Sequence, residues 1–153
     1  MPDPSPLPLA LESSTFFKLL RLVNMTAKPF GRLYERRHHL SLTEWRVMLT
    51  LASTPGLSAV DVSDLLGLDK MAVSRAVRGL EGRGRIERRP DPEDGRRARL
   101  TLTAEGWELY RAIAPSGRGR EEALLSGLSS AERATLDRLL EKLLGQARAI
   151  SEG

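Results

Sequence analysis

Basic side chains are concentrated in about one fifth of the chain. Residues 70–99 contain ten lysines and arginines and five acids, a net charge of +5, whereas the whole 153-residue chain carries +4. Guanidinium and ammonium groups bind phosphate, so a basic stretch of this kind is the electrostatic footprint of a polyanion, with nucleic acid as the first candidate. Charge alone leaves a merely solvated surface as the alternative.

Other chemistries find little support in the sequence. There is no cysteine, which excludes disulfides, thiolate zinc sites, cysteine nucleophiles and thiol redox sensors. The pair His38-His39, even with Glu35, falls short of the four ligands of structural zinc and more simply complements a helix dipole. We find no Ser-His-Asp order, glycine-rich phosphate loop or cluster of carboxylates, so we expect no enzyme, no metal and no cofactor.

Length and hydropathy indicate a single globular domain. No apolar run approaches the roughly 20 residues of a membrane-spanning helix. The N-terminal MPDPSPLPLA lacks the cationic and apolar regions of a signal peptide, and we expect a disordered arm there and a cytoplasmic protein.

A helix over residues 70–81 would separate apolar from basic side chains. On a helical wheel one face holds Val73, Ala76, Val77 and Leu80, and the opposite face holds Met71, Ser74, Arg75 and Arg78, with Lys70 at the N-terminal flank. A short helix capped by Ser58, with Val62, Leu65 and Leu66 as its apolar positions, precedes the turn at 67–69. Two short helices around a glycine-containing turn indicate a helix-turn-helix, whose second helix fits the DNA major groove.

The pattern after Gly84 changes from helical to alternating. Residues 85–89 and 97–102 alternate as two strands around the turn-rich segment 90–95, which predicts a β-hairpin. Asp94 lies two residues before Arg96, where its carboxylate could orient the guanidinium group. An arginine at a hairpin tip suits the narrow minor groove, and a helix with such a hairpin is the winged-helix arrangement.

Further helices are expected on both sides. Residues 13–39 form an amphipathic helix, kinked near Pro29 and Gly31, and residues 42–52 form a second one with Thr43 as its N-cap. The predicted buried stripe of that second helix is Trp45, Met48, Leu49 and Ala52. Thr103 caps a helix interrupted at 115–117, and Ser129 and Glu132 open the last helix as a capping box. The leucine seam of residues 136–147 suits either a second subunit or intramolecular packing.

The segments LTEWRVMLTLA and DVSDLLGLDKMAVSRAVRGLEGRGRIERRPDPEDGRRARLTLTAEG closely resemble the MarR family, the multiple-antibiotic-resistance regulators of bacteria. The DPEDGRR hairpin is the most specific match, and the resemblance spans nearly everything beyond the first dozen residues. It implies a mainly α-helical fold with a small β-hairpin wing, a winged helix-turn-helix. Residues 13–39 and 104–153 would be dimerisation helices, 40–103 the DNA-binding region, and 1–12 a disordered Pro-rich arm.

The resemblance also implies which residues bind DNA. Carried over position by position, they are Lys70, Ser74, Arg75, Arg78, Asp94, Arg96 and Arg97, the last as a backbone contact. Two positions depart from the usual pattern, namely Ser63, where Ala is common, and Arg85, where Leu is common. Arg85 adds a cation near either the DNA or the dimer arm.

These observations together predict a homodimeric, sequence-specific DNA-binding regulator. We expect a repressor that binds a pseudo-palindromic operator and is released by a small aromatic or anionic effector. Candidate effector contacts are Phe30, Tyr34, Trp45 and Arg46, although core packing is the other explanation for the three aromatic side chains. The alternatives are a constitutive regulator and a winged-helix module with an architectural or protein-binding role.

Overall fold

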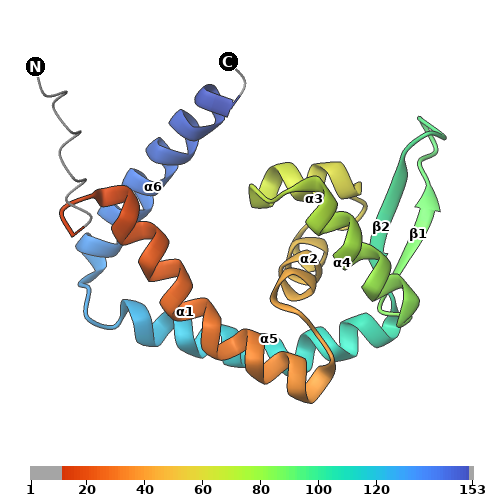
Figure 1. The fold of residues 1–153 in the computed structure, drawn as a ribbon, viewed down its shortest axis with the longest axis horizontal. Coiled ribbons are helices and arrows are strands. Elements are labelled where there is room, and N and C mark those ends of the chain that lie inside the picture. The colour runs from red at the N-terminus through yellow and green to blue at the C-terminus, as the bar shows by residue number, and fades with distance from the viewer. Residues whose placement is uncertain (1–11, 152–153) are drawn as a thin grey trace, which may run out of the picture. The chain divides into compact units, whose positions relative to one another are not determined.

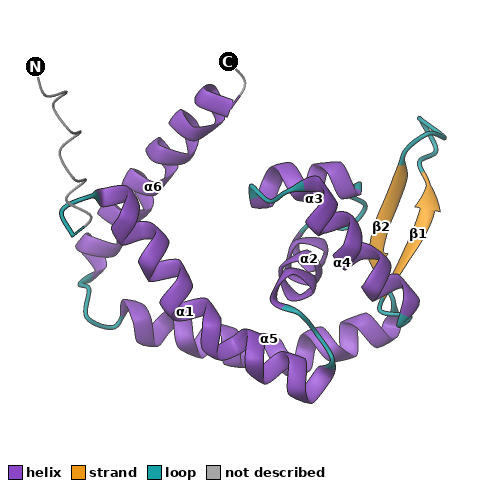
Figure 2. Ribbon diagram, in the orientation of Figure 1, coloured by secondary structure: helices purple, strands orange, loops and turns teal. Residues whose placement is uncertain are grey.

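The computed structural model describes residues 12–151, which form six helices and one β-hairpin (Figures 1 and 2). The order of the elements is α1 (Thr15–His38), α2 (Leu42–Ser53), α3 (Ala59–Leu66), α4 (Lys70–Gly82), β1 (Ile86–Pro90), β2 (Ala98–Leu102), α5 (Ala104–Leu125) and α6 (Ser130–Ser151). The predicted fold class, mainly α with a small hairpin, is confirmed. Apart from Glu12, the Pro-rich arm lies outside the described residues.

Side-chain caps start most of these helices where the sequence indicates. The predicted caps Ser58, Thr103 and Ser129 each accept a backbone N–H of the first turn. The prediction of Thr43 as the N-cap of α2 is wrong. Ser41 takes that position, because its hydroxyl accepts the Glu44 N–H (3.1 Å) while the Glu44 carboxylate accepts the Ser41 N–H (2.8 Å). Each side chain of this capping box satisfies a backbone donor of the other residue.

Two helices differ from prediction in their packing or length. In α2 the buried positions include Val47 and Leu51, whereas Leu49 is exposed and Ala52 is only half-buried. The reason is that α2 contacts α1, α3, α4 and β2, so the buried surface of α2 is wider than the single stripe that the periodicity predicts. The predicted interruption at 115–117 is also wrong, since α5 continues through Pro115. A proline removes one backbone donor, which a helix of 22 residues accommodates.

The chain divides into two compact units between Glu108 and Leu109, inside α5. The first unit contains the hydrophobic core, whose fully buried apolar and aromatic members come from α1, α2, α3, α4, β2 and the loop before α2: Tyr34, Leu40, Val47, Met48, Leu51, Val62, Val73, Val77, Leu80 and Leu100. In the second unit, α6 has no buried residue. No helix among residues 12–151 is long and apolar enough to cross a membrane.

The hairpin is anchored at its base and exposed at its tip. Strands β1 and β2 pair antiparallel from Ile86 opposite Leu102 to Pro90 opposite Ala98. Leu100 also exchanges backbone hydrogen bonds with the loop after α2, donating to the Leu57 carbonyl and accepting the Gly56 N–H, both at 2.9 Å. The hairpin therefore extends from the α2–α4 cluster as a projecting arm (Figure 2). We call residues 86–102 the wing.

Candidate nucleic-acid interface

Helix α4 presents the predicted basic face. The turn before it depends on Gly67, whose φ of 62° is the left-handed conformation that favours glycine. Asp69 then caps α4 by accepting the Ala72 N–H (2.9 Å). As predicted, Val73, Ala76, Val77 and Leu80 are buried. The opposite side exposes Lys70, Arg75 and Arg78, with Ser74 half-buried. Within residues 12–151 no carboxylate pairs with these three cations.

Sequence reasoning left one residue of this face out of the site. Met71 lies one helical turn before Arg75, and 59% of its surface is exposed. The wheel places it correctly among the exposed positions, but residue type alone gives no reason to assign it a role. The signal that finds it is a large apolar side chain exposed on a face that is otherwise basic.

Asp91 organises the tip of the wing, which the sequence reasoning also missed. Its carboxylate accepts Nε (3.0 Å) and Nη2 (3.3 Å) of Arg99 and the backbone N–H of Glu93 (2.9 Å). The hydrogen bonds from Arg99, followed by the one from Glu93, hold the pKa of the Asp91 carboxyl below its ordinary range. An aspartate that accepts an N–H two residues ahead forms an Asx-turn, so its place at the start of a turn-rich segment was the available signal.

Asp94 and Arg96 meet through the backbone rather than through the predicted carboxylate–guanidinium contact. Asp94 Oδ1 accepts the Arg96 backbone N–H (3.1 Å), and the Asp94 carbonyl accepts the Arg97 N–H (2.9 Å). A second Asx-turn therefore fixes the main chain at the tip and leaves the Arg96 guanidinium exposed. Among the described residues no carboxylate neutralises it.

The other arginines of the wing are paired. Arg97 donates to Asp61 (3.3 Å), the residue that also completes the cap of α3, so Arg97 is bound to the helix-turn-helix rather than free as its predicted role suggested. Hydrogen bonds from Ser58, with a smaller contribution from Arg97, lower the pKa of Asp61. Three more ion pairs complete the pattern: Arg88–Glu81, Arg89–Glu87 and Arg99–Asp91.

Arg85 lies against the C-terminal end of α1. Its Nη2 donates to the His38 carbonyl (2.5 Å) and its Nη1 to the His39 carbonyl (3.3 Å). The last carbonyls of a helix have no partner within the helix, so the guanidinium satisfies them and complements the negative end of the helix dipole. Partial burial lowers the pKa of Arg85. Of the two alternatives left open by the sequence, the structure therefore places Arg85 next to the helix expected to be the dimer arm.

The candidate effector contacts lie together inside the first unit. Phe30 and Tyr34 meet edge-to-face with ring centroids 5.1 Å apart, and Tyr34 meets Trp45 in the same way at 5.6 Å. All three aromatic side chains are buried, and Arg46 beside Trp45 is half-buried. In this structure the aromatic cluster serves as core packing.

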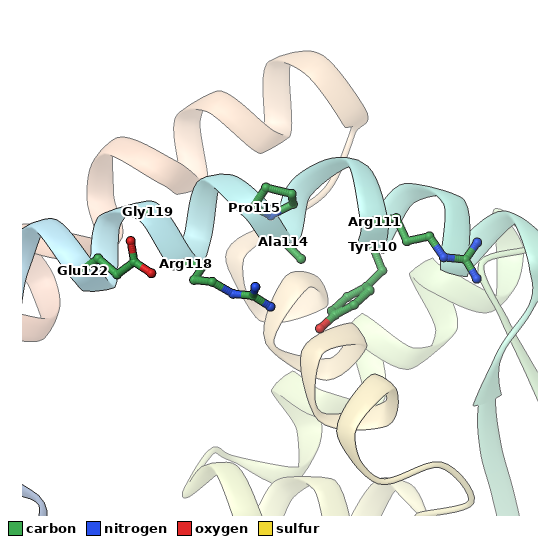
Figure 3. A pocket seen from close by; sticks show the side chains of 7 residues that line it. All are labelled: Tyr110, Arg111, Ala114, Pro115, Arg118, Gly119 and Glu122. Carbon is green, nitrogen blue, oxygen red and sulfur yellow. The ribbon is translucent and has the colours of Figure 1, made fainter.

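A shallow groove of about 400 Å³ runs along α5 in the second unit (Figure 3). Its lining includes Tyr110, Ala114, Arg118 and Glu122, which recur every four residues and so form one helical row. Tyr110 and Arg118 point to the same side of the helix (Figure 3). An aromatic ring and a guanidinium group together suit an aromatic anion, a feature that the sequence reasoning did not single out.

Comparison with known proteins identifies the family. A family model described as the MarR family matches residues 38–97. The transcriptional regulator HosA of Escherichia coli O157:H7 is 30% identical over 136 residues, which cover 89% of this chain and 98% of HosA. The chain belongs to the MarR family. Like the other members, this MarR-family protein is a transcriptional regulator with a winged helix-turn-helix.

Solved structures of MarR-family regulators have the same fold. A MarR/EmrR family transcriptional regulator from Acinetobacter sp. ADP1 superposes with a TM-score of 0.79 and 35% identity, over 86% of this chain and 93% of that one. The PcaV transcriptional regulator of Streptomyces coelicolor, in complex with its natural ligand, superposes with a TM-score of 0.71 and 25% identity, over 90% of this chain and 96% of PcaV.

Proposed function

We propose that this MarR-family regulator is a sequence-specific DNA-binding repressor, with α4 in the major groove and Arg96 of the wing in the adjacent minor groove. One observation carries the proposal. Lys70, Arg75, Arg78 and Arg96 are exposed without carboxylate partners among residues 12–151, whereas the arginines around them are paired. Solubility alone does not require that these four cations stay unpaired while their neighbours form ion pairs. DNA phosphates and guanine edges supply the acceptors that the four cations lack.

The unpaired cations have different roles in this proposal. Arg75 and Arg78, with Ser74 beside them, face base edges, and Lys70 faces the phosphate backbone at the start of α4. Asp94 acts indirectly, since its hydrogen bond to the Arg96 backbone fixes the tip that carries the guanidinium. Arg97 reaches a phosphate only by sharing or leaving Asp61, which makes it a secondary contact.

We further propose that the regulator acts as a homodimer. Apolar side chains are exposed along α1 and α6, among them Phe16, Leu20, Leu139, Leu143 and Leu144. Several exposed apolar side chains along one helix mark an interaction site on that helix. A two-fold dimer requires a two-fold operator, with half-sites about 10–10.5 bp apart.

The test is selection of an operator from a pool of random duplexes, followed by fluorescence anisotropy. We expect a pseudo-palindrome, and an affinity that falls by about 10³–10⁴ between 50 and 200 mM salt if the dimer contacts about 6–8 phosphates. Arg75→Ala or Arg78→Ala should cost about 1–3 kcal/mol and relax specificity at particular base pairs, whereas Arg96→Ala should weaken binding to all sequences.

Arg36→Ala is the matched control, because it removes an exposed cation from α1 instead of α4 or the wing. Operator binding that survives all three substitutions in a folded protein would refute the DNA assignment. It would then favour the alternative of a winged helix that binds protein.

We also propose that a small aromatic or anionic effector releases the regulator from DNA. The natural ligand in the PcaV complex and the α5 groove support it, whereas the candidate contacts Phe30, Tyr34 and Trp45 pack against one another as core in this structure. An effector releases DNA only if it binds more tightly to a dimer whose recognition helices no longer match successive grooves. A coupling of about 1–3 kcal/mol would lower operator affinity 5–150-fold.

Titration of the operator complex with a panel of phenolic acids, with hydrogen peroxide as a parallel arm, tests this mechanism. We expect release by at least one phenolic acid and none by peroxide, because the chain has no cysteine. Release by peroxide alone contradicts the mechanism, and no response to any ligand favours a constitutive regulator.

A further inference from the structure

Met71 is an apolar side chain on the basic face of α4. It precedes Arg75 by four residues and Arg78 by seven, so the three side chains form one row along the helix. The buried side of α4 is already complete, with Val73, Ala76, Val77 and Leu80 in the core. Met71 is 59% exposed and therefore contributes little to that core.

The DNA major groove, which would bind Arg75 and Arg78, also contains an apolar group. In the major groove of B-DNA the C5-methyl of thymine is the one apolar feature, beside the acceptors of guanine that arginine recognises. The N-terminal residues of a recognition helix are the ones that contact base edges. Met71 is the second residue of α4, and its unbranched, polarisable side chain adapts to a methyl group at the groove floor.

We infer that Met71 is a specificity-determining residue that reads thymine methyl groups next to the base pairs contacted by Arg75 and Arg78. The inference rests on the proposed DNA-binding function and deepens it by assigning an apolar component to sequence recognition. Charge supports this occupant over another protein, because Met71 is flanked by Lys70, Arg75 and Arg78, and a partner would have to be both polyanionic and locally apolar.

The experiment is a double-mutant cycle between the protein and the DNA. Each thymine of the selected operator is replaced by deoxyuridine, which removes only the methyl group, and dissociation constants are measured by anisotropy for the wild type and Met71→Ala. For at least one thymine in each half-site, we expect the replacement to weaken wild-type binding about three- to fivefold, as for burying one methyl group. On the thymine operator, Met71→Ala should bind more weakly than the wild type by a similar factor. The same variant should bind the thymine and deoxyuridine operators with equal affinity, because the contact to the methyl group is already lost.

Two variants control the cycle. Met71→Leu keeps an apolar side chain at the site and should retain most of the discrimination between thymine and deoxyuridine. Leu65→Ala truncates an apolar side chain of similar exposure (61%) on α3, outside the helices proposed for the dimer, and should leave the discrimination unchanged. Melting temperatures of all variants should stay close to that of the wild type, because truncation of an exposed side chain costs little stability.

Three outcomes would overturn the inference. They are a Met71→Ala variant that still discriminates thymine from deoxyuridine, an operator in which no thymine methyl contributes, and an equal loss of discrimination in Leu65→Ala. In each case the operator is still bound, so the proposed function survives. Failure to select any operator would refute the proposed function and the role of Met71 together.

Discussion

Gly106 marks a close approach between α5 and the chain segment before β1. A Cβ atom on this residue would lie 2.0 Å from the carbonyl oxygen of Arg85, a backbone atom that cannot rotate away. The contact is held by Thr103, whose hydroxyl donates to the Gly84 carbonyl (2.6 Å) and accepts the Gly106 N–H (3.1 Å). We expect Gly106→Ala to destabilise the fold by about 1–3 kcal/mol through overpacking, measured as a shift in the denaturation midpoint.

Gly82→Ala provides the matched control in the same unit. A Cβ there would meet nothing within 4 Å, so this change should be neutral or slightly stabilising. Equal effects of the two substitutions would contradict the steric explanation and indicate a general sensitivity to loss of glycine.

At the scale of elements, Arg85 connects the end of α1 to the segment between α4 and β1. Its guanidinium is the donor that binds the last carbonyls of α1, at His38 and His39. We expect Arg85→Leu to cost about 1–2 kcal/mol, since charge-assisted bonds at a partly exposed site are lost. Hydrogen exchange should accelerate at the amides of residues 35–40, and Arg85→Lys should restore part of the protection. Unchanged exchange in Arg85→Leu would rule out this connection.

The Asp91 carboxylate stabilises the tip of the wing, and its lowered pKa predicts how this stabilisation changes with pH. Because the folded state lowers the pKa of Asp91, its stabilisation is fully present above the ordinary pKa of an aspartate and is lost as the pH falls through the lowered value. Asp91→Asn should therefore increase hydrogen exchange of the wing amides and weaken operator binding at neutral pH. The difference in exchange between the wild type and Asp91→Asn should shrink in acid, with Asp64→Asn on α3 as the control. A difference that is constant with pH would exclude the ion pair to Arg99 as its cause.

Much of the element structure was predictable because its signals are local. Helical periodicity locates the buried face of α4, and the Ser-x-x-acid spacing identifies the caps at Ser58 and Ser129. The same spacing stands at Ser41 and Glu44, but the adjacent Thr43 competes with Ser41 as a capping residue, and only the structure decides between them. The pair Arg97–Asp61 joins residues 36 positions apart, so no local pattern reveals that Arg97 is bound.

At the scale of the whole molecule, the leucines of α6 in the second unit are not buried within the subunit. Leu143 is 48% exposed, and Leu139 and Leu144 are similarly exposed along the helix. If a second subunit covers this seam, Leu143→Asp should shift the protein to monomers in analytical ultracentrifugation and lower operator affinity by removing the two-fold arrangement. Leu65→Asp on α3, at an even more exposed leucine, should leave the oligomeric state unchanged. A dimer that persists in Leu143→Asp would exclude α6 as the main interface.

The pairing of the wing arginines also limits how many counterions DNA binding can release. Residues 70–99 hold ten cations, but the exposed ones without an acid partner are Lys70, Arg75, Arg78 and Arg96. A dimer then displaces about eight cations from the DNA at most, so the logarithm of affinity should fall with the logarithm of salt concentration with a slope no steeper than about −7. A steeper slope would mean that phosphates displace acid partners of the paired arginines, such as Asp61, Glu81, Glu87 or Asp91, and that forming the complex breaks ion pairs of the free protein.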